Sequence, residues 1–443
     1  MSAKQHYVVI GLGVTGLSVV RYLKTLSVTI SVMDTRSQLP QLDEFKKANP
    51  KIDVHLGELN LEILKNADVI VLSPGMSLAH PVIAAALKQG IPVIGDIELF
   101  AEANKAPVIA ITGTNAKSTV TTLVGEMMLS AGLRTAVGGN LGVPVLDLLM
   151  QNPKADVFVL ELSSFQLETT FSLAPKVATI LNITPDHMDR YDSVEAYRAA
   201  KLRVYQNCEV AVCNLDDKLT DTDAKRKIYF TLNTPGENQF GLLRDNQQTF
   251  LAHGDEKILA THELPVIGKH YQANALAALA IGFAFGLPLA PMQTVLREFK
   301  GLPHRCQFVR ELADVKWYND SKGTNVGATL AAIEGIGSEM SGKLILILGG
   351  IGKNADFTSM APVVAKYARH VVLIGRDGPE IANALGDAVP KSFAKSMEEA
   401  VTAASAHAIA GDCVLLSPAC ASFDMFKHFE HRGDVFTQVV ERL

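Results

Sequence analysis

The stretch Ile109-Ala110-Ile111-Thr112-Gly113-Thr114-Asn115-Ala116-Lys117-Ser118-Thr119 decides the fold of the middle of this chain. Its β-branched apolar start is typical of a buried strand, which breaks at Gly113. The residues that follow the stretch, Val120–Leu129, have helical character. A strand–loop–helix unit directs backbone N–H groups and the positive end of a helix at one point, where a phosphate chain can bind. The stretch therefore predicts a phosphate-binding loop.

The side chains of this loop suit the same role. Lys117 would reach the outer phosphates, and Ser118 or Thr119 would supply a hydroxyl to Mg²⁺. Ala116 precedes the lysine, so the loop departs from the common Gly-x-x-x-x-Gly-Lys-[Ser/Thr] pattern. The alternative interpretation is a capped helix start with a solvated lysine.

Length and composition bound the class of protein. A chain of 443 residues exceeds one ordinary core and predicts about three domains. With 48% hydrophobic and 20% charged residues, the composition is that of a soluble globular enzyme and argues against disorder. A net charge of −5 gives no electrostatic reason to expect nucleic acid or an anionic membrane as partner. We expect a monomer.

Cysteine usage and hydropathy predict a cytoplasmic protein. The cysteines are odd in number and lack C-x-x-C spacing, so we expect reduced core residues, not zinc ligands or disulfides. The strand-like run Tyr7–Ile10 leaves no room for a secretory signal, and the most apolar helical stretch, Ala275–Leu287, is too short to span a bilayer. The five cysteines are Cys208, Cys213, Cys306, Cys413 and Cys420.

The N-terminal segment alternates strands and helices. Tyr7–Ile10 leads into Gly11-Leu12-Gly13-Val14-Thr15-Gly16, a G-x-G-x-x-G turn that opens a helix, and a second strand ends at Asp34. This βαβ pattern is typical of a doubly wound parallel sheet with a nucleotide or diphosphate at the glycine turn. The alternative is a tight turn that only lets helix and sheet pack closely.

Two further α/β segments follow. Strands Val157–Glu161, Val177–Asn182 and Val210–Asn214 share the second segment with the phosphate loop, and polar turns at Asp221–His262 predict a small peripheral sheet. A stiff turn at Gly301-Leu302-Pro303 starts the third segment. We therefore predict an α/β protein of three domains: Rossmann-like over 1–95, P-loop ATPase-like over 96–301, and Rossmann-like over 302–443.

Polar residues follow several predicted strands, where ligands of parallel sheets bind. A carboxylate at Glu161, opposite the phosphate loop, suits Mg²⁺, although it is also a plausible helix cap. The loop Asn182–Tyr191 carries Asp186 and His187, a candidate base and a candidate metal ligand. Lys201 alone reads as a surface lysine on a helix. In the third segment, loops with hydroxyls and lysines predict a carboxylate-binding pocket; they are Asp320–Thr324, Gly349–Lys353 and Ser417–Asp424.

Taken together, these motifs resemble the Mur ligase family along essentially the whole chain. The similarity rests on Gly113–Thr119, Glu161–Ser164, Asn182–Asp189, His304-Arg305 and Asp320–Thr324. Within the family, the glycine turn, Asp34-Thr35-Arg36 and Leu416–Ser422 resemble the member that adds D-glutamate. The resemblance implies ATP-dependent amide synthesis in peptidoglycan precursor assembly: ATP phosphorylates the alanyl carboxylate of UDP-N-acetylmuramoyl-L-alanine, and the amine of D-glutamate displaces phosphate.

The resemblance also implies roles for individual residues. Lys117, His187 and Lys201 would be catalytic, and two Mg²⁺ ions would be held by Ser118 with Glu161 and by His187 with a carbamylated Lys201. ATP would contact Gly113, Thr114, Asn115, Ala116, Lys117, Ser118, Thr119, Asn274, Arg305 and Asp320. The UDP-sugar would contact Val14, Thr15, Asp34, Thr35, Arg36, Ser73, Asn140 and His187. D-glutamate would contact Lys322, Thr324, Lys353, Ser422 and Phe429.

The sequence departs from the family pattern at four positions. Ala116 replaces a glycine, which should tighten the phosphate loop, and Tyr271 replaces an asparagine near the adenine. Ile351 stands where an acid is frequent and Phe423 where leucine is frequent. Folylpolyglutamate-type ligases should lack the N-terminal domain, a nicotinamide oxidoreductase would leave Lys117 idle, and a nucleotide-dependent switch protein would need no third domain. Sister Mur ligases are the nearest alternative.

Overall fold

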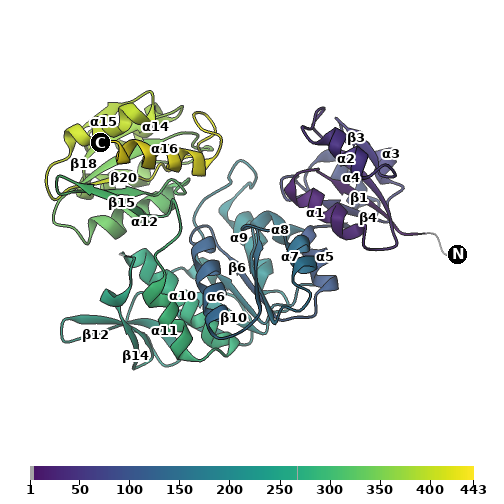
Figure 1. The fold of residues 1–443 in the computed structure, drawn as a ribbon, viewed down its shortest axis with the longest axis horizontal. Coiled ribbons are helices and arrows are strands. Elements are labelled where there is room, and N and C mark those ends of the chain that lie inside the picture. The colour runs from purple at the N-terminus through teal and green to yellow at the C-terminus, as the bar shows by residue number, and fades with distance from the viewer. Residues whose placement is uncertain (1–3, 267) are drawn as a thin grey trace.

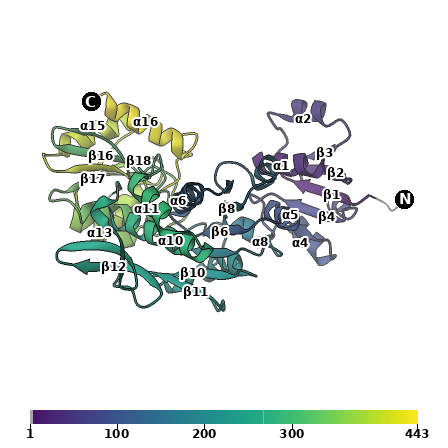
Figure 2. The same ribbon diagram turned by 60° about the horizontal axis from the view of Figure 1, so that its bottom comes forward.

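Three separate β-sheets organise the chain in the computed structural model, which describes residues 4–266 and 268–443. The domains that carry them are called N-terminal, central and C-terminal below. Figure 1 shows the N-terminal and C-terminal domains at opposite ends of the central domain, and Figure 2 shows the same order in a second view. The three-domain α/β architecture is confirmed, whereas the boundaries at 95/96 and 301/302 stay predictions.

The N-terminal domain is a five-stranded parallel sheet in the order β3-β2-β1-β4-β5. Its central strand is buried from Tyr7 to Ile10 and packs apolar side chains on both faces, as expected for a parallel sheet covered by helices on both sides. The strands are β1 (His6–Ile10), β2 (Thr29–Asp34), β3 (Asp53–Leu56), β4 (Val69–Leu72) and β5 (Val93–Ile94). The helices are α1 (Val14–Leu23), α2 (Leu42–Ala48), α3 (Leu61–Leu64) and α4 (Pro81–Lys88).

The central domain has a nine-stranded sheet in the order β14-β13-β12-β11-β10-β9-β6-β8-β7. Buried apolar residues pack on both faces, and α6 lies against α10 and α11 on one of them. The strands are β6 (Val108–Thr112), β7 (Thr135–Gly139), β8 (Val157–Glu161), β9 (Val177–Ile180), β10 (Val210–Asn214), β11 (Lys227–Phe230), β12 (Gln239–Asp245), β13 (Gln248–His253) and β14 (Glu256–Ala260). The helices are α5 (Asp96–Ala103), α6 (Lys117–Ser130), α7 (Val145–Gln151), α8 (Ser164–Glu168), α9 (Val194–Leu202), α10 (Lys269–Phe285) and α11 (Leu289–Glu298).

The expected peripheral sheet is present as the antiparallel strands β12–β14, and it extends the main sheet instead of standing apart. Two residue pairs make the junction, Tyr229 with Gln239 and Phe230 with Phe240. Strands β12 and β13 form a hairpin whose turn residues, Asn246 and Gln247, have φ of 46° and 69°. The sequence predicted the polar turns of this region but gave no sign of the pairing with β11.

The C-terminal domain is a six-stranded sheet in the order β15-β16-β20-β17-β18-β19, parallel except for the β15–β16 hairpin. The strands are β15 (Gln307–Leu312), β16 (Val315–Asn319), β17 (Leu344–Gly349), β18 (Ala368–Ile374), β19 (Lys391–Phe393) and β20 (Cys413–Leu416). The helices are α12 (Val326–Gly337), α13 (Ala361–Tyr367), α14 (Gly378–Leu385), α15 (Met397–His407) and α16 (Phe429–Glu441).

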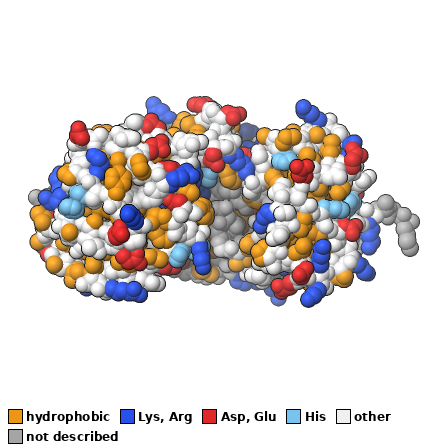
Figure 3. All heavy atoms as spheres, turned by 90° about the horizontal axis from the view of Figure 1, so that it is seen from above, with side chains coloured by type: hydrophobic (Ala, Val, Ile, Leu, Met, Phe, Trp, Pro, Cys, Tyr) orange, Lys and Arg blue, Asp and Glu red, His pale blue; other side chains and the backbone are white. Residues whose placement is uncertain are grey.

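The surface is recessed between the N-terminal domain and the rest of the molecule, as the view from above shows, and acidic and basic side chains are interspersed on that face (Figure 3). Among the helices that the structure describes, none combines the length and the apolar character that crossing a bilayer requires.

Candidate active site

The phosphate loop connects the end of β6 to the start of α6, as the sequence predicts. Ala116, the residue before the helix, has a left-handed backbone with φ of 66°. A residue with a Cβ adopts this conformation at a cost of about 1–2 kcal/mol, and glycine adopts it freely. We expected Ala116 to tighten the loop. In the structure, the alanine strains the loop backbone at this one residue, and the loop retains its backbone N–H groups.

Lys117 folds back over its own loop. Its Nζ donates to the carbonyl oxygens of Gly113 at 2.8 Å and Thr114 at 2.9 Å. Burial lowers the pKa of Lys117, and the nearby charge of Glu161 opposes that shift. An ammonium held at the phosphate loop by these two carbonyls is placed to neutralise phosphate oxygens.

Glu161, at the end of β8, provides the test of whether this site suits Mg²⁺. The side chain is 3% exposed, and its Oε1 accepts a hydrogen bond of 2.7 Å from Asn140. Its Oε2 is buried without a hydrogen-bond partner among the described residues. A buried, half-satisfied carboxylate beside a phosphate loop and the Ser118 hydroxyl fits a hard cation with oxygen ligands. In this structure the Ser118 Oγ accepts a 2.7 Å hydrogen bond from Arg305.

Lys201 is no surface lysine. It lies on α9 with 1% exposure, and its Nζ donates to the Gly113 carbonyl oxygen at 2.9 Å. Burial and the charge of Lys117 lower its pKa well below the ordinary range. A neutral amine is the form that adds CO₂, because its nitrogen lone pair is free. The geometry supports the carbamylation that the resemblance implies, which stays a prediction.

The loop after β9 brings the central and C-terminal domains together. Asp186 accepts a hydrogen bond of 3.1 Å from Asn325 and lies 3.6 Å from the Lys353 ammonium. Asn325 also pairs with Asn115 of the phosphate loop, with Nδ2 to Oδ1 at 3.1 Å. His187 adjoins Asp186, has φ of 58°, and packs edge-on against Phe165. In the described residues, no group of three or more His, Cys, Asp or Glu forms a ready metal site, so the roles of His187 and Lys201 as metal ligands remain predictions.

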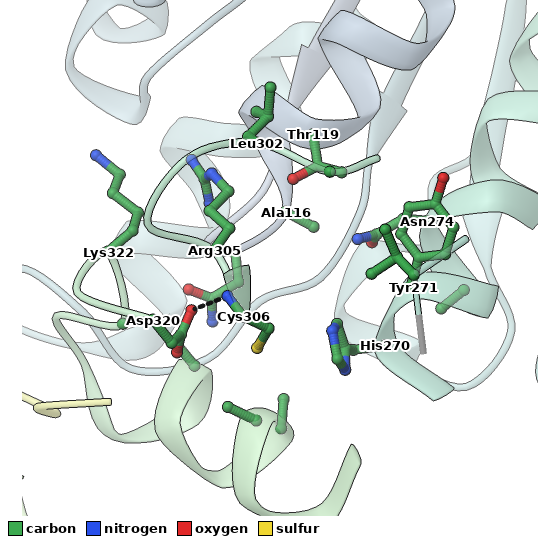
Figure 4. A pocket seen from close by; sticks show the side chains of 18 of the residues that line it. Ala116, Thr119, His270, Tyr271, Asn274, Leu302, Arg305, Cys306, Asp320 and Lys322 are labelled. Atoms are coloured by element: carbon green, nitrogen blue, oxygen red, sulfur yellow. Dashed lines mark hydrogen bonds between the residues drawn. The ribbon is translucent and has the colours of Figure 1, made fainter. Parts of the chain in front are cut away.

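A cavity of about 190 Å³ lies beside the phosphate loop, between the start of α10 and the linker to the C-terminal domain (Figure 4). Six of the predicted ATP residues line it: Asn115, Ala116, Thr119, Asn274, Arg305 and Asp320. Burial raises the pKa of Asp320 to about 6, against hydrogen bonds from Ser417 and the Cys306 N–H.

The cavity is also lined by Tyr271, which the sequence placed near the adenine, and by His270 and Lys322, which it did not assign to this cavity. Tyr271, 2% exposed, stacks parallel to Phe299, and its hydroxyl has no hydrogen-bond partner in the described part of the chain. His270 also lines the cavity, and burial lowers its pKa to about 4. Lys322, predicted for D-glutamate, faces this cavity as well.

A second cavity, of about 540 Å³, lies at the glycine turn of the N-terminal domain. The predicted UDP-sugar residues Val14, Thr15, Asp34, Thr35, Arg36, Ser73 and Asn140 all line it, whereas His187 does not. The Asp34 carboxylate accepts four hydrogen bonds, from the Leu12 N–H, the Arg36 N–H and the Arg36 guanidinium. Burial acts to raise the pKa of Asp34, but these bonds outweigh it and lower the pKa to about 2. Its acceptor sites are thereby filled, so Asp34 shapes the turn and orients Arg36.

The glycine turn is packed closely, as the alternative interpretation of it expects. A Cβ on Gly16 would lie 1.8 Å from the Gly11 carbonyl oxygen. Gln166 closes the far wall of this cavity, and behind it lies Asp96, 2% exposed, with one carboxylate oxygen lacking a partner among the described residues. Sequence reasoning assigned no role to Gln166 or Asp96, although the spacing of Ser163 and Gln166 is that of a capping box, which is present at the start of α8.

The five residues predicted for D-glutamate do not share one cavity. Thr324 and Lys353 line a cavity of about 490 Å³ together with His187. The Lys322 ammonium lies 3.8 Å from the centre of the Phe429 ring, and Ser422 is buried. Two of the positions that depart from the family pattern lie in the same region. The Ile351 backbone forms a β-bridge with Ala421, and Phe423 is 70% exposed.

Comparison with known proteins covers the whole chain. Residues 5–95 match the profile of the Mur ligase MurD-like N-terminal domain, residues 111–282 the Mur ligase middle domain, and residues 304–420 the glutamate ligase domain of Mur ligases. The UDP-N-acetylmuramoylalanine--D-glutamate ligases of Pseudomonas putida and Legionella pneumophila are 50% and 49% identical, over 99% of this chain and 98% and 99% of theirs.

Solved structures agree on the fold. MurF from Acinetobacter baumannii superposes with a TM-score of 0.65 at 18% identity, covering 99% of this chain and 92% of that one. UDP-N-acetylmuramate-alanine ligase MurC from Thermotoga maritima gives 0.61 at 17% identity, with 99% of both chains covered. At these identities the likeness shows the fold alone.

Proposed function

The chain belongs to the Mur ligase family, and on that premise we propose that it joins D-glutamate to UDP-N-acetylmuramoyl-L-alanine, with conversion of ATP to ADP and phosphate, in peptidoglycan precursor synthesis. The observation that carries this function is the identity of about half of all residues, over 99% of the chain, with ligases of that name. The N-terminal match, over residues 5–95, favours this member over folylpolyglutamate-type ligases.

The reaction is the one that the family resemblance implies, and the placement of the side chains supports it. The alanyl carboxylate attacks the γ-phosphorus of ATP, and ADP leaves with an acyl phosphate formed. The D-glutamate amine then attacks the acyl carbon, and the tetrahedral intermediate expels phosphate. Two anions must approach in the first step, so the Lys117 ammonium over the phosphate loop lowers their repulsion. Asn140 links the UDP-sugar cavity to Glu161 and so ties the sugar to the phosphate loop.

We propose that Mg²⁺ binds at Ser118 and Glu161, with a second ion at His187 and a carbamylated Lys201. When bound, Mg²⁺ neutralises phosphate charge and orients the γ-phosphate. Arg305 must release the Ser118 hydroxyl for this ligand set to form. Asn274, Tyr271 and Asp320 would enclose the nucleoside, and Lys322, Thr324 and Lys353 would bind the carboxylates of D-glutamate.

We also propose that the protein acts as a monomer in the cytoplasm. Its nucleotide substrates are cytoplasmic metabolites, and all five cysteines are free thiols in the structure. Size-exclusion chromatography with light scattering tests the monomer, since a dimer would elute at twice the mass of the chain.

The experiment that tests the function is phosphate release from ATP with UDP-N-acetylmuramoyl-L-alanine and a panel of amino acids. We expect turnover with D-glutamate, and at least about 100-fold less with L-glutamate, L-alanine or a diamino acid, because wrongly placed carboxylates leave buried cations unpaired. Equal turnover with L-glutamate or a diamino acid would refute the assignment. Lys117→Ala, which removes the ammonium from the loop, serves as the inactive control.

A further inference from the structure

Arg190 joins the N-terminal and central domains at the rim of the UDP-sugar cavity. Its guanidinium donates to the carbonyl oxygens of Pro74 at 2.8 Å and Met76 at 3.1 Å, both in the turn that follows β4. The same group donates to the Glu168 carboxylate of the central domain at 3.1 Å. The Arg190 side chain is 14% exposed, so these contacts are largely shielded from water.

The central domain fixes this guanidinium from several sides. It lies flat on the Phe165 ring, with 3.9 Å between Cζ and the ring centre. The other neighbours of that ring are His187, edge-on at 4.9 Å, and Tyr191, stacked at 5.9 Å. The Arg190 N–H also donates to the His187 carbonyl oxygen at 2.9 Å. Arg190 is therefore rigidly related to the loop that carries His187.

The turn that Arg190 holds forms part of the UDP-sugar cavity, since Ser73, Pro74, Gly75 and Met76 all line it. The two accepting carbonyls face the guanidinium. Their hydrogen bonds therefore fix the position of the turn, and they do not themselves contact a ligand in the cavity. A lysine could not replace this arrangement, because the planar fork of arginine serves two carbonyls and a carboxylate at once.

We propose that Arg190 is a positioning residue, which sets the distance between the UDP-sugar cavity of the N-terminal domain and the phosphate-loop side of the central domain. This inference rests on the proposed function. UDP-N-acetylmuramoyl-L-alanine must reach from the first site to the second, whereas UDP alone needs only the first. Loss of Arg190 therefore weakens use of the whole substrate far more than the binding of UDP.

The test compares Arg190→Ala and Arg190→Lys with the wild type. We expect kcat/KM for UDP-N-acetylmuramoyl-L-alanine to fall about 10- to 100-fold in both variants, the range for losing hydrogen bonds from a charged group. The Kd for UDP, measured by calorimetry, should change less than about twofold. Glu168→Gln keeps the shape of the side chain but removes the charge that holds the Arg190 guanidinium. It should also lower kcat/KM for UDP-N-acetylmuramoyl-L-alanine more than it weakens UDP binding, and it replaces the Arg190 variants if these fold poorly.

Arg21→Ala is the matched control, because Arg21 of the N-terminal domain, whose side chain is half-exposed, makes an ion pair with Asp147 of the central domain at 2.5 Å. We expect a change of less than about threefold in kcat/KM for this variant. An equal loss of UDP affinity, full activity of Arg190→Lys, or an equal effect of Arg21→Ala would each overturn the proposal. Failure of the wild type to use D-glutamate would refute the proposed function instead, and direct binding of UDP-N-acetylmuramoyl-L-alanine compared with UDP would still decide the role of Arg190.

Discussion

Asp96→Asn should stabilise this protein above pH 6, although it removes a charge from the start of a helix. Asp96 begins α5, where the helix dipole favours a carboxylate. The side chain is 2% exposed, its one side-chain hydrogen bond, from Gln166, is long at 3.5 Å, and its Oδ1 has no partner in the described residues. Burial dominates and raises the pKa of Asp96 from 3.8 to about 6.

The size and sign of the effect follow from this shift. The folded state holds a proton on Asp96 that the unfolded state has released between pH 3.8 and about 6, so stability falls as pH rises through that window. A shift of about two pKa units corresponds to about 3 kcal/mol, lost in full above pH 6. Asparagine is neutral at every pH and nearly the same shape, so the variant avoids this loss.

Urea unfolding of both proteins at pH 4 to 8, followed by far-ultraviolet circular dichroism, measures the difference. We expect the free energy of unfolding of Asp96→Asn, relative to wild type, to rise by up to about 3 kcal/mol from pH 4 to 7 and then stay level. Asp156→Asn is a control without pH dependence in this range, since hydrogen bonds from Arg134 lower the pKa of Asp156 to about 2 and the carboxylate titrates below pH 4. A difference that does not vary with pH would refute the reasoning.

Three further predictions concern the site. Lys201→Ala should lose at least about 100-fold in phosphate release and regain part of it with formate or acetate, which can replace a carbamate oxygen; indifference to the substitution would exclude a role as metal ligand. Gly16→Ala should abolish UDP binding measured by calorimetry, because the new Cβ would lie 1.8 Å from the Gly11 carbonyl oxygen; unchanged affinity would show that the turn tolerates the clash. Burial lowers the pKa of Lys322 to about 8, with the charges of Arg305 and Lys117 adding to the shift. The KM for D-glutamate should therefore rise as pH passes 8 and the cation is lost, and Lys322→Arg should show no such rise in a pH profile of initial rates.

The sequence predicted the parts of the site that obey local rules. A glycine or a polar residue at the end of an apolar strand is visible without a structure, which is why the loops at Gly113 and Glu161 are found where expected. Lys201 shows the limit of such rules. Its helix has ordinary spacing, and only the packing of α9 behind the phosphate loop reveals that its amine is buried.

Contacts between domains could not be predicted from the sequence, for a different reason. The partners of Arg190 are backbone carbonyls more than a hundred positions away, and carbonyls carry no sequence signature. Arg305 is also bonded to a residue far away in the sequence, since its guanidinium donates to the Ser118 hydroxyl, 187 positions earlier. The family resemblance implied roles for residues of the site, but it did not indicate which of them contact each other in this conformation.

The hairpin of β12 and β13 has a practical consequence. The hairpin joins the central sheet through two β-ladder residue pairs between β11 and β12. Its turn at Asn246–Gln247 lies outside every cavity described above. A tight turn of two residues at the tip of a sheet extension is a natural place to splice in foreign sequence. A fluorophore or affinity tag inserted there would report on the ligase, or immobilise it, while the three cavities described above stay free.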